Sequence, residues 1–156
     1  MSHTNSLLKT LSELKASGAF PQRLLLRDPS VAATIEMDVH QLDSLSIQLS
    51  MLRVSPQQST KVTLNEKAAD LSQRITGLME KLSVIEIDDS RGEALLRSDS
   101  PVANEEQRLY YELLAQRQGV TTLHRYQGSI LRSHRKEVPF ILTREAMAKL
   151  ITDLVG

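Results

Sequence analysis

The side chains best suited to bind a ligand form a basic segment between positions 117 and 136. This segment contains no acidic residue, and His124, His134 and Tyr126 lie among its cations. Cationic groups at this density can bind the phosphates of a nucleic acid or of a small ligand. The sequence therefore predicts a candidate anion-binding or nucleic-acid-binding surface, whose members are Arg117, Arg125, Arg132, Arg135 and Lys136.

The same segment has a simpler interpretation, as the solvated face of a hairpin whose arginines pair with carboxylates elsewhere in the chain. Five acidic residues between positions 86 and 99, set against Arg91 and Arg97, are available as partners. The chain carries 19 basic and 19 acidic residues, and a net charge of zero argues against a dedicated nucleic-acid or membrane binder. We therefore favour the ion-paired interpretation and keep the binding surface as the alternative.

Acid–base catalysis is a third hypothesis, and it rests on His124. An enzyme of this kind requires Asp88 or Glu112 to meet His124 in a pocket that shifts their pKa values. Adjacent acids such as Asp88 and Asp89 more often serve the turn in which they lie. The four histidines show no ligand spacing along one helix or strand, so we expect no metal site. An enzyme therefore ranks below both binding hypotheses.

Composition excludes several kinds of chemistry. The chain has no cysteine, which excludes disulfides, cysteine-bearing zinc sites and a thiol nucleophile. Its six glycines are scattered, so it has neither a P-loop nor a dinucleotide-binding fingerprint, and we expect no cofactor. The N-terminus has no apolar segment of the signal-peptide type, and no run is long enough to span a bilayer. Together with the lack of cysteine, these features predict a cytoplasmic protein.

The elements that would position the candidate residues centre on a long helix predicted over Thr63–Leu82. Thr63 and Glu66 have the spacing of a capping box. Apolar residues then recur every three or four positions, at Leu64, Ala68, Leu71, Ile75, Leu78 and Leu82. From Val84 to Asp88 β-branched residues alternate with acids, and Gly92 follows in a stretch of turn formers. The helix is therefore expected to lead directly into a β-hairpin that returns over Glu93–Ser98.

Two further hairpins are predicted, and each contains one ambiguous stretch. Alternating apolar residues predict strands over 31–39 and 45–51, although 43–54 also fits helical spacing. We choose strand there because serine, a poor helix former, is repeated. Residues 107–116 likewise fit a helix or a strand. The turn signal at Gln118-Gly119 and the strand-like residues after it favour a hairpin.

Helices are predicted at both ends of the chain. Asn5 or Ser6 can cap the first, whose apolar face holds Leu7, Leu8, Leu11 and Leu14. Thr143 can cap the last, whose buried face is formed by Met147, Leu150, Ile151 and Leu154. Residues 23–27 are either a short strand or a tether on the core, and 138–142 are expected to form a short strand.

The sum of these elements predicts one α+β domain over residues 1–156. Its antiparallel sheet is built from consecutive hairpins, with the N-terminal, long central and C-terminal helices packed mainly on one face. The element order is loosely similar to that of small α+β secretion chaperones, which tend to be strongly acidic. This chain is neutral, so the likeness is one of element order alone. Because the sequence shows no site chemistry, a net charge of zero and one compact domain, we expect a small cytoplasmic, non-enzymatic protein-interaction protein, adaptor or chaperone-like, that forms a homodimer and binds no membrane.

Overall fold

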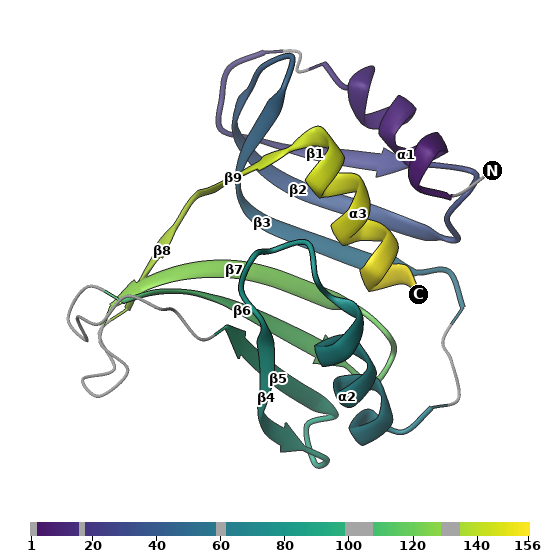
Figure 1. The fold of residues 1–156 in the computed structure, drawn as a ribbon, viewed down its shortest axis with the longest axis vertical. Helices are drawn as coiled ribbons and strands as arrows, with labels where there is room; N and C mark the ends of the chain where they lie inside the picture. Colours follow the sequence, from purple (N-terminus) through teal and green to yellow (C-terminus); the bar gives the residue numbers. More distant parts are fainter. Residues whose placement is uncertain (1–2, 16–17, 59–61, 99–107, 129–134) are drawn as a thin grey trace.

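The computed structural model describes residues 3–15, 18–58, 62–98, 108–128 and 135–156, with the backbone alone for residues 3–5 (Figure 1). Within these ranges the chain forms three helices and nine strands, and strands predominate. The helices are α1 (His3–Ser12), α2 (Leu64–Arg74) and α3 (Arg144–Val155). The strands are β1 (Gln22–Arg27), β2 (Ala33–Leu42), β3 (Ser46–Pro56), β4 (Leu82–Asp88), β5 (Glu93–Ser98), β6 (Leu109–Gln116), β7 (Thr121–Gly128), β8 (Arg135–Val138) and β9 (Phe140–Thr143).

All paired strands are antiparallel, and they follow the order β1-β2-β3-β7-β6-β5-β4. Two meanders, β1 to β3 and β4 to β7, are joined where residues 52–54 of β3 pair with residues 121–123 of β7. Beyond that short ladder, β9 pairs with the start of β3 and β8 pairs with the end of β7. The segment 135–143 therefore occupies the space between the two meanders (Figure 1).

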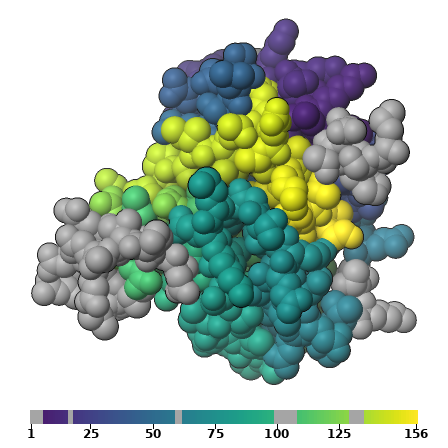
Figure 2. All heavy atoms as spheres, viewed as in Figure 1, coloured from purple at the N-terminus to yellow at the C-terminus, as the bar shows by residue number. Residues whose placement is uncertain are grey.

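One cluster of buried apolar side chains connects the helices to the sheet. Alternate residues of β2, namely Ala33, Ile35, Met37 and Val39, belong to it, as do residues of all three helices. Helix α1 packs against α3, and α2 packs against β4 and β5. The helices lie in front of the sheet in Figure 1, and the same view in Figure 2 shows α1, α3 and the segment 62–98 forming the surface on this side.

The long central helix predicted over Thr63–Leu82 is wrong in its second half. Helix α2 ends at Arg74, because Ile75 adopts an extended conformation. Ile75, Leu78 and Leu82 are nevertheless buried, with exposed fractions of 3%, 4% and 0%. Ile75 and Leu78 are buried in a loop that runs beside α3, where Gly77 lies against the Ala146–Leu150 turn, and Leu82 is the first residue of β4. A burial pattern of period three to four therefore arises here without a helix.

Two other local predictions are wrong. Helix α1 begins at His3, ahead of the expected caps Asn5 and Ser6, and ends at Ser12, before Leu14; the single strand expected over 138–142 is divided at Pro139, which has no amide hydrogen to donate, into β8 and β9.

Most of the remaining local predictions agree with the structure. Both ambiguous stretches form strands, since β3 covers most of 43–54 and β6 covers most of 107–116. The hairpins β4–β5 and β6–β7 form as expected. Thr63 accepts a hydrogen bond from the amide of Glu66 (3.1 Å), and Thr143 accepts one from the amide of Ala146 (3.0 Å). Residues 23–27 belong to a strand, β1, that pairs with β2.

Candidate functional site

The face of the sheet opposite the core cluster is largely polar. On β2 the residues that alternate with the core are partly exposed and include Glu36 and Asp38. Arg23 of β1 binds Asp38 (Nε–Oδ1, 2.8 Å), and Arg53 of β3 lies 3.6 Å from Glu36. Cross-strand pairs of opposite charge stabilise a sheet modestly, so this face has an ordered arrangement of charges.

A hollow of about 530 Å³ lies on this face across β3, β6, β7 and β8. Its basic lining residues are Arg53, His124 and Arg135, and its acidic lining residue is Glu112. Tyr126 lines it as well, and burial raises the pKa of the Tyr126 phenol. That phenol therefore remains a hydrogen-bond donor at neutral pH. The hollow combines cationic donors, a hydroxyl and one carboxylate, a set that suits a polar or anionic ligand.

Glu112 is held between two arginines at the edge of the hollow. It is 9% exposed, receives a hydrogen bond from Nη1 of Arg135, and lies 3.5 Å from Nη2 of Arg97. Each arginine also stacks on a tyrosine, with Arg97 5.1 Å from the ring centre of Tyr110 and Arg135 3.9 Å from that of Tyr126. A buried carboxylate with two such partners is compensated in charge. This cluster therefore fixes the geometry of one wall of the hollow.

The pair required by the enzyme hypothesis lies in this hollow. Glu112 and His124 are direct cross-strand neighbours on β6 and β7, and both line the cavity. Nε2 of His124 is also 3.9 Å from a carboxylate oxygen of Glu137. Asp88 lies elsewhere, at the end of β4, where its Oδ1 accepts hydrogen bonds from the amides of Ser90 and Arg91 in the following turn. Of the two carboxylates considered from sequence, Glu112 is the one near His124.

The basic segment is divided between different parts of the molecule. Arg117 lies at the β6–β7 turn and donates to the backbone oxygen of Asp89 (2.8 Å). Arg125 projects to the core side, where it binds Glu80 (3.1 Å) and stacks 4.2 Å from the Tyr111 ring centre. Arg135 lines the hollow, Lys136 is exposed on β8, and Arg132 lies outside the described residues.

The division follows from strand geometry, because successive residues of a strand face opposite sides of the sheet. Arg125 therefore faces away from its neighbours His124 and Tyr126. The ion-pair partners of the basic segment also differ from the prediction. Arg125 binds Glu80 and Arg135 binds Glu112, and both carboxylates lie outside the acidic stretch 86–99. Sequence reasoning missed Arg53, whose position in the alternating pattern of β3 was the available signal.

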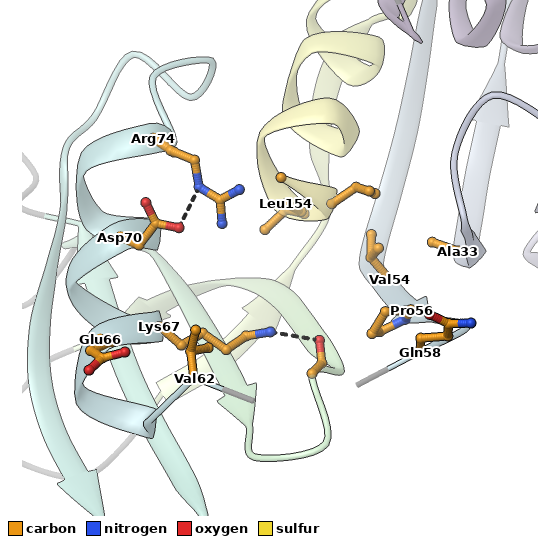
Figure 3. A pocket seen from close by; sticks show the side chains of 13 residues that line it. Ala33, Val54, Pro56, Gln58, Val62, Glu66, Lys67, Asp70, Arg74 and Leu154 are labelled. Carbon is orange, nitrogen blue, oxygen red and sulfur yellow. Dashed lines mark hydrogen bonds and ion pairs between the residues drawn. The ribbon is translucent and has the colours of Figure 1, made fainter. Parts of the chain in front are cut away.

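A second cavity of about 380 Å³ lies between α2, the end of α3 and the end of β3 (Figure 3). Val54 and Leu154 contribute to its apolar lining, and Lys67, Asp70 and Arg74 approach it from α2. Nζ of Lys67 donates to the backbone oxygen of Gly119 (3.2 Å). The cavity thus combines apolar and charged walls, which is the usual composition of a small-molecule site.

The third feature is the outer edge of β4, which pairs with β5 and with no second strand among the described residues. Val84 is 38% exposed and Ile85 50% exposed. Ile85 forms a bulge, because Val84 and Glu86 pair with the consecutive residues Leu96 and Leu95. Shortly before the strand, Met79 is 99% exposed and has a positive φ of 61°. Val84 and Ile85 are therefore exposed at an open strand edge, and Met79 is exposed in the loop that precedes it.

The described residues contain no group of His, Asp and Glu side chains that could hold a metal ion. No helix in this part of the chain is long and apolar enough to cross a membrane. Comparison of the chain with protein-family models, curated proteins and solved structures finds no match.

Proposed function

We propose that this chain is a small cytoplasmic, non-enzymatic protein-interaction protein, adaptor or chaperone-like, that self-associates as a homodimer through the β4 edge. The observation that carries the proposal is the exposure of Val84 and Ile85 at an open strand edge. An open edge presents unpaired N–H and C=O groups that can pair with another strand.

Met79 adds to the argument because its backbone is unusual. A positive φ is uncommon for a bulky residue and costs about 1–2 kcal/mol. In an isolated chain this conformation projects an apolar side chain entirely into water. Burial of that side chain against a partner would offset the cost. Exposed apolar groups that gather in one place often mark an interaction surface.

A second copy is the occupant that fits the edge best. Val84 and Ile87 both lie on the core side of β4. A two-fold antiparallel pairing that sets Val84 opposite Ile87 of the second copy keeps the core sides of both sheets together. The strand begins after the basic Lys81 and ends at the acidic Asp88 and Asp89. Antiparallel pairing therefore brings the basic start of one copy near the acidic end of the other.

Size-exclusion chromatography with light scattering tests this proposal. Wild-type protein is expected at twice the 17.5 kDa chain mass, and Ile85→Lys at the single mass. Ile141→Lys is the matched control, since Ile141 is 63% exposed on β9, outside the β4 edge. Circular dichroism checks that both variants fold. A monomeric wild type, or a dimer that survives Ile85→Lys, would overturn the proposal.

The binding of an anionic ligand, including a nucleic acid, is the second candidate function. It is favoured by the convergence of Arg53, His124 and Arg135 on one hollow. Titration with inorganic phosphate, followed through the ring protons of His124 by NMR, is expected to show saturable shifts that Arg53→Gln weakens. Lys136→Gln, on an exposed side chain of β8, is the control. Equal shifts in all three proteins would contradict a site in the hollow.

A further inference from the structure

The cavity between α2 and α3 has features that the proposed self-association does not use. Its apolar residues include Val54 from β3 and Leu154 and Val155 from α3. Its cationic residues, Lys67 and Arg74, both come from α2. These two residues are seven positions apart, which places them on one side of the helix. Figure 3 shows Lys67 and Arg74 on one side of the cavity and Leu154 and Val54 on the other.

Lys67 is a partly buried cation without an ion-pair partner among the described residues. Its amino group donates to the backbone oxygen of Gly119. Burial lowers the pKa of Lys67, the nearby charge of Arg74 lowers it further, and the charge of Asp70 opposes these effects only in part. A charge removed from water without a counter-ion is unfavourable, so an anion beside Nζ would stabilise the protonated amine.

Arg74 can contribute to the same anion. Its Nε lies 2.9 Å from Oδ2 of Asp70. The terminal nitrogens of its guanidinium group point toward the cavity in Figure 3, whereas the carboxylate of Glu66 points away from it. Asp70 neutralises part of the positive charge on this wall. The wall therefore suits an anion with a single negative charge better than one with two.

From this arrangement we propose that the cavity binds a small amphiphilic carboxylate, with Lys67 and Arg74 holding the carboxylate group and the Val54–Leu154 wall holding its aliphatic chain. A simple inorganic anion would leave the apolar wall in contact with water. A neutral aliphatic molecule would leave Lys67 without a direct ion-pair partner. Both parts of the ligand are therefore needed to match both walls.

Octanoate is a suitable probe for the full-length chain, and octanol and octylamine of the same length test the need for negative charge. Calorimetric titration is expected to show saturable binding of octanoate and little binding of octylamine. Lys67→Met, which keeps the length of the side chain and removes its charge, is expected to weaken octanoate binding about tenfold or more. Lys67→Arg is expected to retain most of the affinity.

The site itself is checked by NMR, since methyl signals of Val54 and Leu154 are expected to shift on addition of octanoate. Lys9→Met, on an exposed lysine of α1, is the matched control and is expected to bind like wild type. Octanol bound as tightly as octanoate, or Lys67→Met bound like wild type, would overturn the proposal. Ile85→Lys is expected to bind octanoate normally, which separates this site from the β4 edge.

Discussion

Replacement of Asp28 by asparagine is expected to destabilise the attachment of α1 to the sheet. The Asp28 side chain is buried after β1 and accepts hydrogen bonds from three hydroxyls. The donors are Ser6 (3.1 Å), Thr10 and Ser30 (2.5 Å), and the amide of Ser30 adds a fourth bond (2.8 Å). Two of the hydroxyls belong to α1, so one carboxylate joins the helix to the β1–β2 connection.

The magnitude follows from the bonds that asparagine cannot make. Thr10 donates to the second carboxylate oxygen, which becomes an amide nitrogen in Asp28→Asn. Net contributions of hydrogen bonds to a charged group are about 1.5–3 kcal/mol. We therefore expect the free energy of unfolding at pH 7 to fall by about 2 kcal/mol. For a chain of this length that corresponds to a melting temperature lower by about 4–8 °C.

The pH dependence gives the prediction a second, independent signature. Burial raises the pKa of the Asp28 carboxyl, but the hydrogen bonds from Ser30, Thr10 and Ser6 outweigh that effect, so the pKa lies below its ordinary value of 3.8. A carboxyl with a lowered folded-state pKa stabilises the fold above the unfolded-state pKa, and this stabilisation is lost as the pH falls through the folded-state pKa. The difference in the free energy of unfolding between wild type and Asp28→Asn should therefore stay at about 2 kcal/mol from pH 5 to 7 and shrink below pH ~4.

Urea unfolding at one fixed chain concentration, repeated across this pH range, measures the difference. Asp89→Asn is the control, because the Asp89 side chain is 77% exposed. It is expected to change the free energy of unfolding by less than about 0.5 kcal/mol. If Asp28→Asn unfolded at the wild-type urea concentration at pH 7, the Asp28 carboxylate would not stabilise the attachment of α1 to the sheet.

Three further substitutions test the packing of the fold. Leu71→Ala removes a fully buried side chain of α2 and is expected to cost about 2–5 kcal/mol in urea unfolding; a cost below 1 kcal/mol would contradict its place in the core. Thr143→Ala removes the cap of α3 and is expected to lower the free energy of unfolding by about 1 kcal/mol, whereas Thr143→Ser should restore it. Gly119→Ala places a methyl 2.7 Å from Cγ of Pro56 at a φ of +105°, while Gly18→Ala meets no atom within 4 Å at a φ of +99°. The first should therefore lower the melting temperature more than the second, and equal shifts would argue against the contact with Pro56.

Much of the fold could be predicted because local patterns and burial coincide in the strands. Ile35, Met37 and Val39 alternate with polar residues in the sequence, and the same three residues are buried in β2. Helix α3 could also be predicted, from its Thr143 cap and the helical spacing of its apolar residues. The end of the central helix could not be predicted, because Ile75 and Leu78 in a buried loop and Leu82 at the start of β4 continue the helical spacing by chance.

The candidate sites depend on contacts between residues far apart in the chain. The hollow needs Arg53 beside Thr122, to whose hydroxyl its Nε donates (3.3 Å), and this contact arises only from the β3–β7 pairing. No local sequence pattern predicts that the two meanders pair through β3 and β7. Similarly, the division of Arg125 from Arg135 depends on which side of the sheet the helices cover. The charge pattern of the sequence therefore indicated that arginines would form the candidate site, but it did not predict which arginines lie together.

Segment 135–156, which joins the two meanders, is synthesised after both of them. Strand β9 completes the first meander, β8 completes the second, and α3 packs on α1. A chain emerging from the ribosome can form each meander early from neighbouring residues. It can close the space between them only after β8, β9 and α3, which follow both meanders in the chain, have left the exit tunnel. Until then the start of β3 and the end of β7 lack their native neighbours, so the nascent chain exposes the strand edges that are most open to mispairing.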